Sequence, residues 1–142
     1  HRHYRRQRQM CIRDRLIVIK RLVDDLCIPV NIISAPIHRE SDGLAMSSRN
    51  WHITDDERPK VIILKQSLDW IVERIQSGNL DFFELENEAK ARIKKQGFDV
   101  DYITCCNSEN LDFAANDDKK ITVLGAMYTK KARLIDNVSI AF

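Results

Sequence analysis

The residues best suited to chemistry lie in one stretch, residues 36–50, which reads Pro-Ile-His-Arg-Glu-Ser-Asp-Gly-Leu-Ala-Met-Ser-Ser-Arg-Asn. Ser47 and Ser48 offer two hydroxyl donors beside backbone N–H groups, and Arg49 adds a permanent, fork-shaped cation. Gly43 lets the backbone approach a ligand closely. These groups together suit a phosphate, so the stretch is a candidate anion-binding loop. A solvated surface turn is the alternative for the same residues, and composition alone leaves it open.

Other polar residues give weaker signals. Arg39 and Arg49 are the positive charges of the loop, and a lone histidine such as His38 is more typical of a surface residue than of an acid–base catalyst. Asp42, directly before Gly43, is expected to fix the loop by accepting backbone N–H bonds. The cysteines and histidines lack zinc-ligand spacing, so no metal site is predicted. Adjacent acids fit solvation or helix ends better than a catalytic dyad: Asp24-Asp25, Asp55-Asp56 and Asp117-Asp118.

Length and composition limit the class of protein. The chain has 142 residues, of which 44% are apolar and 31% charged, enough for one ordinary core and unlike a collagen-like or mostly disordered chain. No apolar run approaches the roughly 20 residues of a membrane span, and the run Leu16–Ile19 is too short for the core of a signal peptide. A cytoplasmic location is expected, with reduced thiols at Cys11, Cys27, Cys105 and Cys106.

The net charge of +2 hides a basic head. Residues 1–15 hold six arginines and one acid, whereas the remaining 127 residues hold 17 bases and 20 acids. One interpretation is an arginine arm that contacts nucleic-acid phosphates, with Tyr4 available to stack, on a small α+β binding module. The other is a disordered or spurious head unrelated to the domain. The second is favoured because the head lacks apolar periodicity and no basic surface continues after it.

The elements before the loop resemble the end of a parallel α/β unit. Leu16–Leu26 carries apolar residues at helical spacing, and Val30–Ser34 is a β-branched run that predicts a short buried strand. A helix followed at once by a buried strand is typical of a β-α-β unit. Open α/β sheets bind ligands beyond the carboxyl ends of their strands, which favours a ligand at the long loop Ala35–Ile53.

The elements after the loop predict a helix pair. Thr54 with Glu57 is a capping box that opens a helix, and Pro59 predicts an irregular first turn. Gly78 is expected to end this helix. Its apolar stripe consists of Val61, Leu64, Leu68, Ile71 and Ile75.

A second helix, from Asp81 to Gln96, is expected to stop at Gly97. Three strands follow, at Val100–Cys105, at Lys120–Tyr128 and within Ala132–Ile140. The chain from residue 37 onward is therefore a compact α+β unit with a small antiparallel sheet.

The string from Pro36 to Asn50, with Glu57-Arg58 shortly after, resembles the signature of the pantoate–β-alanine ligase (pantothenate synthetase) family. Gly97-Phe98, Asp101-Tyr102 and the run Ala132–Asn137 follow in the order and spacing of that family's C-terminal domain. The resemblance spans Leu16–Phe142.

The resemblance implies an α/β fold of the cytidylyltransferase-like (HIGH) superfamily. Residues 16–36 would be the last helix and strand of a nucleotide-binding, Rossmann-like domain, and residues 37–142 a small α+β lid domain with an antiparallel sheet. The implied reaction is ATP-dependent. Pantoate is adenylated with release of pyrophosphate, and β-alanine then attacks the pantoyl-adenylate to give pantothenate and AMP. Mg²⁺ is expected with ATP, the full-length enzyme is expected to be a homodimer, and neither nucleic acid nor membrane is an expected partner.

The resemblance also assigns residues. The segment from Met46 through Ser47 and Ser48 to Arg49 corresponds to a KMSKS-like loop that closes over the ATP phosphates, with Met46 lining the adenosine pocket. The position of His38 contributes a nucleotide contact. The HIGH-type motif, the pantoate-binding glutamines and a Gly-x-Lys-Asp segment belong before Leu16 in the family, and this sequence does not show them. We therefore predict no catalytic residue among these residues, and a fragment with little ATP binding and no catalysis of its own.

Overall fold

The computed structural model describes residues 12–142, so most of the predicted basic head, residues 1–11, lies outside the described residues. The chain divides into two compact units, residues 1–36 and residues 37–142. The two units are described separately.

The first unit contains one helix. Helix α2 spans Ile12–Asp25, so it begins four residues before the predicted start at Leu16 and includes the last part of the predicted head. It ends where Cys27 takes a positive φ of 49° and the Ile28 N–H donates to the carbonyl of Val23 at 2.9 Å. The predicted helix is confirmed, with an earlier start.

The predicted buried strand Val30–Ser34 is wrong. These residues form no strand, and the side chains of Val30 and Ile33 are 54% and 85% exposed. A strand persists only where a neighbouring strand satisfies its N–H and C=O groups. Within residues 12–142, no segment pairs with this run. The β-branched residues of this run favour a strand, but the described residues provide no neighbouring strand with which the run could pair.

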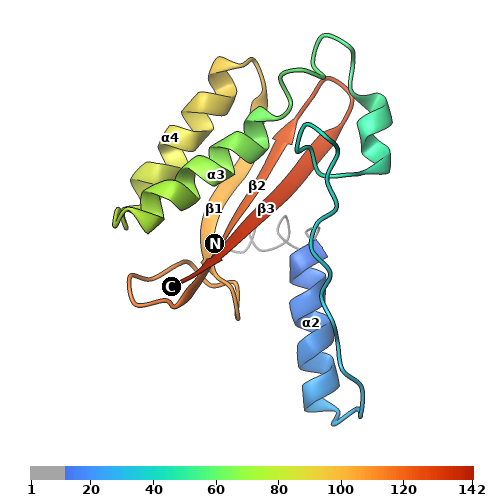
Figure 1. Ribbon diagram of the computed structural model, residues 1–142, viewed down its shortest axis with the longest axis vertical. Coiled ribbons are helices and arrows are strands. Elements are labelled where there is room, and N and C mark those ends of the chain that lie inside the picture. Colours follow the sequence, from blue (N-terminus) through green and yellow to red (C-terminus); the bar gives the residue numbers. More distant parts are fainter. Residues whose placement is uncertain (1–11) are drawn as a thin grey trace. The chain divides into compact units, whose positions relative to one another are not determined.

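The second unit is a helix pair on a three-stranded sheet, as predicted (Figure 1). Helices α3 and α4 lie side by side over one face of the sheet. The strands are antiparallel in the order β1-β2-β3, and β2 has the predicted bounds. The elements are η1 (Ser48–His52), α3 (Ile63–Gln76), α4 (Phe82–Lys95), β1 (Asp99–Asn107), β2 (Lys120–Tyr128) and β3 (Arg133–Ala141).

Helix α3 begins at Ile63, later than the capping-box prediction at Thr54. Residues 55–62 form successive turns instead, which fits the irregular start expected at Pro59. The end of the helix is as predicted. Gly78 has a φ of +94°, its N–H donates to the Ile75 carbonyl, and the Asn79 N–H donates to the Arg74 carbonyl, both at 3.0 Å. This is a Schellman motif, in which glycine takes the left-handed position.

The core lies between the helices and the sheet. Leu64 and Leu68 of α3 lie over β2 at Gly125, where a Cβ atom would come within 3.0 Å of a methyl group of each leucine. Glycine thus lets α3 approach the sheet closely. The core cluster includes the fully buried side chains of Leu68, Ile71, Ile75, Leu85, Ile93, Ile103, Ile121 and Met127. Within residues 12–142, no helix is both long and apolar enough to cross a membrane.

Candidate functional site

The loop predicted to bind an anion begins as a tight hairpin over residues 38–46. The Met46 N–H donates to the His38 carbonyl at 2.9 Å, and the Glu40 N–H donates to the Leu44 carbonyl at 2.8 Å. At the tip, Gly43 has a φ of +93° and its N–H donates to the Glu40 carbonyl at 2.8 Å. The positive φ explains why glycine stands at this position: it makes the turn.

Asp42 fixes the tip of the hairpin, as predicted. Its Oδ1 accepts a hydrogen bond from the Leu44 N–H at 3.1 Å, and its Oδ2 is paired with the guanidinium of Arg58. The Arg58 hydrogen bond and the Leu44 N–H both hold the pKa of Asp42 below its ordinary value.

The hairpin leads into a short 3₁₀ helix, η1, through the predicted phosphate-binding residues. Ser47 is the N-cap residue, and its Oγ accepts a hydrogen bond from the Arg49 N–H at 3.2 Å. A serine hydroxyl that accepts one bond still has its own proton to donate. Both Ser47 and Ser48 are exposed, so their hydroxyls can reach a ligand.

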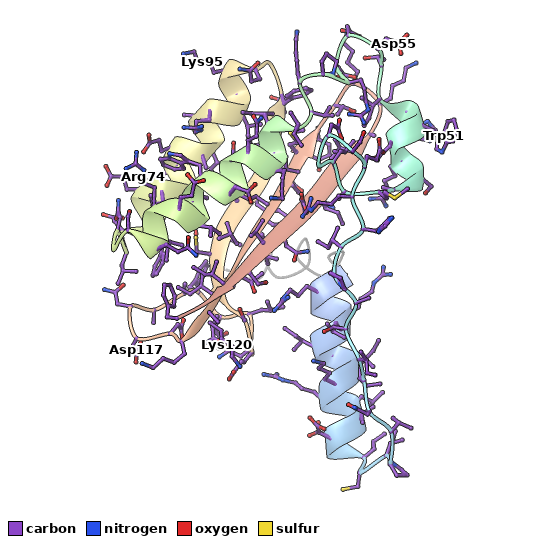
Figure 2. The ribbon with its side chains drawn as sticks, viewed as in Figure 1. Trp51, Asp55, Arg74, Lys95, Asp117 and Lys120 are labelled. Atoms are coloured by element: carbon purple, nitrogen blue, oxygen red, sulfur yellow. The ribbon has the colours of Figure 1, made fainter. Side chains whose placement is uncertain are left out.

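A hollow of about 600 Å³ opens beside this segment. It brings together three of the five predicted ATP-binding residues, Met46, Ser47 and Ser48. His38 and Arg49 are exposed but do not line it. Trp51 of η1, which is 90% exposed, projects outward beside it (Figure 2). The full lining is Glu40, Met46, Ser47, Ser48, Asn50, Trp51 and Arg58.

Arg39 is a structural residue, which corrects the expectation that it supplies positive charge for a ligand. Its Nη1 and Nη2 donate to the two carboxylate oxygens of Asp136 in β3 at 2.8 and 3.0 Å, and Nη1 also donates to the Gly43 carbonyl at 3.1 Å. Asp136 is buried, with 7% of its surface exposed. This bidentate pair fastens the hairpin to the sheet and neutralises the charge of Arg39.

Arg49 contrasts with its neighbours. Arg58 is paired with Glu40 at 2.5 Å and with Asp42, so its charge is compensated, like that of Arg39. Nothing in the described part of the chain forms an ion pair with Arg49, whose side chain is exposed. Arg49 is therefore the arginine of this loop whose charge is available to an anion.

Asn50 connects residues on both arms of the hairpin, a role that its position in the sequence does not indicate. Its Nδ2 donates to Glu40 Oε1 at 2.6 Å and to the Ala45 carbonyl at 3.1 Å. Asn50 ends the string that carries the family resemblance, and Arg58 follows it there, but neither was assigned a role. Spacing along the chain carries no sign that the two side chains converge on Glu40.

A second clamp joins the turns before α3 to the turn between β2 and β3. The buried carboxylate of Glu57 accepts hydrogen bonds from the Thr54 hydroxyl at 2.7 Å and from the Lys130 N–H at 2.9 Å. Burial alone would raise the pKa of Glu57, but these hydrogen bonds outweigh it and hold the pKa below the ordinary value. Beside it, a hydrogen bond from Lys130 lowers the pKa of Asp56 to about 2.

The other residues of the resemblance also serve structure. Asp101 of β1 accepts hydrogen bonds from Nε and Nη2 of Arg133 in β3 at 2.8 and 2.5 Å, and this guanidinium lies 5.9 Å from the ring centroid of Tyr102. Phe98 is part of the core. These contacts stabilise the sheet to which the hairpin is joined by the Arg39–Asp136 pair.

The described residues around the hollow offer hydrogen-bond donors to a ligand. Residues 12–142 hold no group of three or more histidine, cysteine or acidic side chains that could bind a metal ion. Burial raises the pKa of the Cys105 thiol in β1, which keeps that thiol neutral and unreactive. The serines that line the hollow, followed in the chain by the exposed Arg49, suit a polyanion.

Comparison with known proteins relates the chain to one enzyme family. The sequence model of the family described as pantoate-beta-alanine ligase matches residues 13–139. The chain is 58% identical over 125 residues to a pantothenate synthetase of Cellvibrio japonicus and 57% identical over 126 residues to one of Saccharophagus degradans. These matches cover 88% and 89% of the chain, and 44% of each relative. The chain thus spans less than half the length of these curated relatives.

A solved structure gives the same result. The crystal structure of pantothenate synthetase from Thermus thermophilus superposes with a TM-score of 0.78 at 31% identity, over 87% of this chain and 45% of that one. The family match runs from residue 13 to residue 139, far more than half of the chain. The chain therefore belongs to the pantoate–β-alanine ligase family.

Proposed function

We propose that this chain supplies the phosphate-binding lid of an ATP-dependent ligase that condenses pantoate with β-alanine. The reaction proceeds through a pantoyl-adenylate and yields pantothenate, AMP and pyrophosphate. The observation that carries the proposal is the segment Met46–Arg49, where two exposed serines line a hollow and an exposed arginine without an ion-pair partner in the described residues follows them directly in the chain. The family membership supplies the substrates.

The segment fits the charge that develops during adenylation. As the pantoate carboxylate attacks the α-phosphorus, negative charge grows on the phosphate oxygens and on the departing pyrophosphate. The hydroxyls of Ser47 and Ser48 donate to these oxygens, and Arg49 offers a bidentate cation to the pyrophosphate. Glu40 lines the same hollow, but its pairing with Arg58 and Asn50 offsets its repulsion of a phosphate.

The nucleoside end of ATP is assigned to Met46 and His38. Met46 is more than half exposed and lines the hollow, so its thioether chain can pack against the nucleoside. The carbonyl of His38 accepts the Met46 N–H and retains a second lone pair for a nucleotide donor. Mg²⁺ would arrive bound to the ATP phosphates and keep several of its waters, which fits a lid that brings no carboxylate cluster of its own in the described residues.

The remaining features of the proposal concern the longer ligase. We propose that residues 16–36 end a Rossmann-like domain, that the full-length enzyme is a cytoplasmic homodimer, and that catalysis and pantoate binding belong to the part of the relatives this chain does not cover. The 142 residues alone are expected to bind ATP weakly and to form no pantothenate.

The decisive experiment places this segment in a working enzyme. Residues 13–139 replace the matching segment of the Cellvibrio japonicus pantothenate synthetase, which is 58% identical. The chimera is expected to form pantothenate with stoichiometric AMP. Arg49→Ala in the chimera is expected to lower kcat/KM for ATP on the order of a hundredfold, because one preorganised cationic donor to the transition state is lost.

The matched control is Lys95→Ala, which removes an exposed cation from the C-terminal end of α4, a helix that contributes no residue to the hollow (Figure 2). It is expected to leave the kinetics unchanged. A chimera that forms no pantothenate although it is folded, or an Arg49→Ala variant with the ATP kinetics of the parent chimera, would overturn the proposal.

A further inference from the structure

We propose that Asn50 is a positioning residue that holds the segment Met46–Arg49 in its phosphate-binding shape by means of Glu40. The nature of the ligand rests on the proposed function, but the positioning itself is a property of this chain. The side chain of Asn50 bridges the two arms of the hairpin, with Glu40 on one arm and Ala45 on the other.

The bond from Asn50 Nδ2 to the Ala45 carbonyl closes a small loop. The four residues enclosed between Ala45 and Asn50 are Met46, Ser47, Ser48 and Arg49, the four residues of the predicted phosphate segment. Within this loop, the Asn50 N–H donates to the Ser47 carbonyl at 3.0 Å and the Arg49 N–H donates to Ser47 Oγ at 3.2 Å. The side chain of Asn50 is thus the tie across the base of a loop that has no buried side chain of its own.

Glu40 makes this tie rigid. Its Oε1 accepts the hydrogen bond of Asn50 at 2.6 Å, and its Oε2 accepts that of Arg58 at 2.5 Å. Arg58 also pairs with Asp42 at the tip of the hairpin. Both carboxylate oxygens are therefore engaged, so the carboxylate cannot rotate without losing a charge-assisted bond. The Asn50 amide is held against a fixed acceptor.

The rest of the unit does not depend on this tie. The hairpin is fastened to β3 by Arg39 and Asp136, and the turns before α3 are fastened to Lys130 by Glu57. Loss of the Asn50 bonds should therefore loosen the phosphate segment without unfolding the unit. This separation distinguishes positioning from general stabilisation, and it defines the test.

The test in the 142-residue chain is the backbone dynamics of Ser47, Ser48 and Arg49, measured by ¹⁵N relaxation. Asn50→Asp replaces the donor with a carboxylate that faces Glu40. We expect the order parameters of these three amides to fall below about 0.6, the range of a flexible backbone, while those of α3 stay near 0.85. The double variant Glu40→Gln/Asn50→Asp restores a donor–acceptor pair between positions 40 and 50 with the roles exchanged, but not the bond to the Ala45 carbonyl, so it is expected to recover only part of the order.

Asn79→Asp is the matched control. The side chain of Asn79 accepts one hydrogen bond, from the Asp81 N–H at 3.0 Å, and a carboxylate can do the same. This variant should leave the dynamics of the segment unchanged. Unchanged order parameters in Asn50→Asp, or an equal loss of order throughout α3 and the sheet, would overturn the positioning role.

The same variant in the Cellvibrio chimera links position to function. Asn50→Asp is expected to raise KM for ATP about tenfold, the equivalent of one hydrogen bond's contribution, and to leave KM for pantoate and the melting temperature unchanged. A parent chimera without ATP-dependent activity would contradict the proposed function, but it would not affect the conclusion from the relaxation experiment. An active chimera whose ATP KM is unaffected by Asn50→Asp would overturn the inference alone.

Discussion

Arg39 and Arg49 show how two like residues in one loop take opposite roles. Both are arginines of the resemblance string, and sequence alone offered both as charge for a ligand. In the structure, Arg39 forms a bidentate pair with the buried Asp136, whereas Arg49 is exposed and, in the described part of the chain, unpaired. The partner that decides between these roles lies 97 residues away along the chain, so no local pattern could have separated them.

The difference predicts opposite effects of truncation on stability. Arg39→Ala leaves the carboxylate of Asp136 buried without its cation, and it is expected to lower the free energy of unfolding of the chain by about 2–3 kcal/mol. Arg49→Ala, which removes no partner, should leave it within about 0.5 kcal/mol of the parent. Urea unfolding of both variants measures the difference. Equal stabilities would show that the Arg39 pair contributes nothing net.

The lowered pKa of Glu57 predicts that the stability of the folded chain depends on pH. Its folded-state pKa lies below its ordinary value, so the ionised carboxylate contributes stability that is fully present above the unfolded pKa of about 4.3 and is lost as the pH falls through the folded value. Glu57→Gln cannot ionise. The melting temperature of the parent should therefore exceed that of Glu57→Gln above about pH 5, and the gap should narrow as the pH falls toward about 2. A gap that stays constant over this range would contradict a contribution from the charge of Glu57.

At the scale of elements, local chemistry determined most of the second unit. Helix α4 is capped by Asp81, whose carboxylate accepts the Glu84 N–H at 2.9 Å, and β2 matches its predicted bounds. What failed were features that depend on distant partners. Val30–Ser34 lacks a paired strand in the described residues. Glu57 accepts the Thr54 N–H at 3.4 Å, as a capping box predicts, but it also accepts the Lys130 N–H, which lies 73 residues away along the chain. That the loop binds an anion stays a prediction, and its hairpin shape and its tie at Asn50 arise from contacts that spacing does not reveal.

The contact between α3 and β2 at Gly125 predicts a packing effect. Gly125 lacks the positive φ that would strain an alanine, but an added methyl would meet Leu64 and Leu68 at 3.0 Å. Gly125→Ala is therefore expected to lower the free energy of unfolding by about 1–3 kcal/mol through overpacking.

Chemical denaturation of the 142-residue chain measures this effect, and the double variant Gly125→Ala/Leu68→Ala tests its cause. Since the smaller side chain makes room for the new methyl, the double variant should lose less than the sum of the two single losses. Strict additivity would show that the methyl and Leu68 do not compete for the same space.

At the scale of the whole molecule, the role of the basic head has to be considered separately from that of the folded chain. The family match begins at residue 13, one residue after the start of α2, so residues 1–11 lie outside both the match and the described structure. Their charge accounts for the positive net charge of a chain whose remainder is mildly acidic. The family membership predicts small-molecule substrates and gives the head no partner, whereas its arginines would suit a polyanion such as DNA.

Deletion of residues 1–11 decides between these two interpretations. The deletion removes Arg2, Arg5, Arg6 and Arg8. If all four neutralised phosphates, binding to duplex DNA would weaken with salt with a logarithmic slope of about −3.6. We expect instead that the intact chain and the shortened chain bind duplex DNA equally poorly at physiological salt, because the folded part is mildly acidic and its loop arginines, apart from Arg49, are paired with carboxylates. Fluorescence anisotropy over a range of salt concentrations measures both. Salt-dependent binding that disappears on deletion would contradict this expectation and assign the arm to nucleic acid.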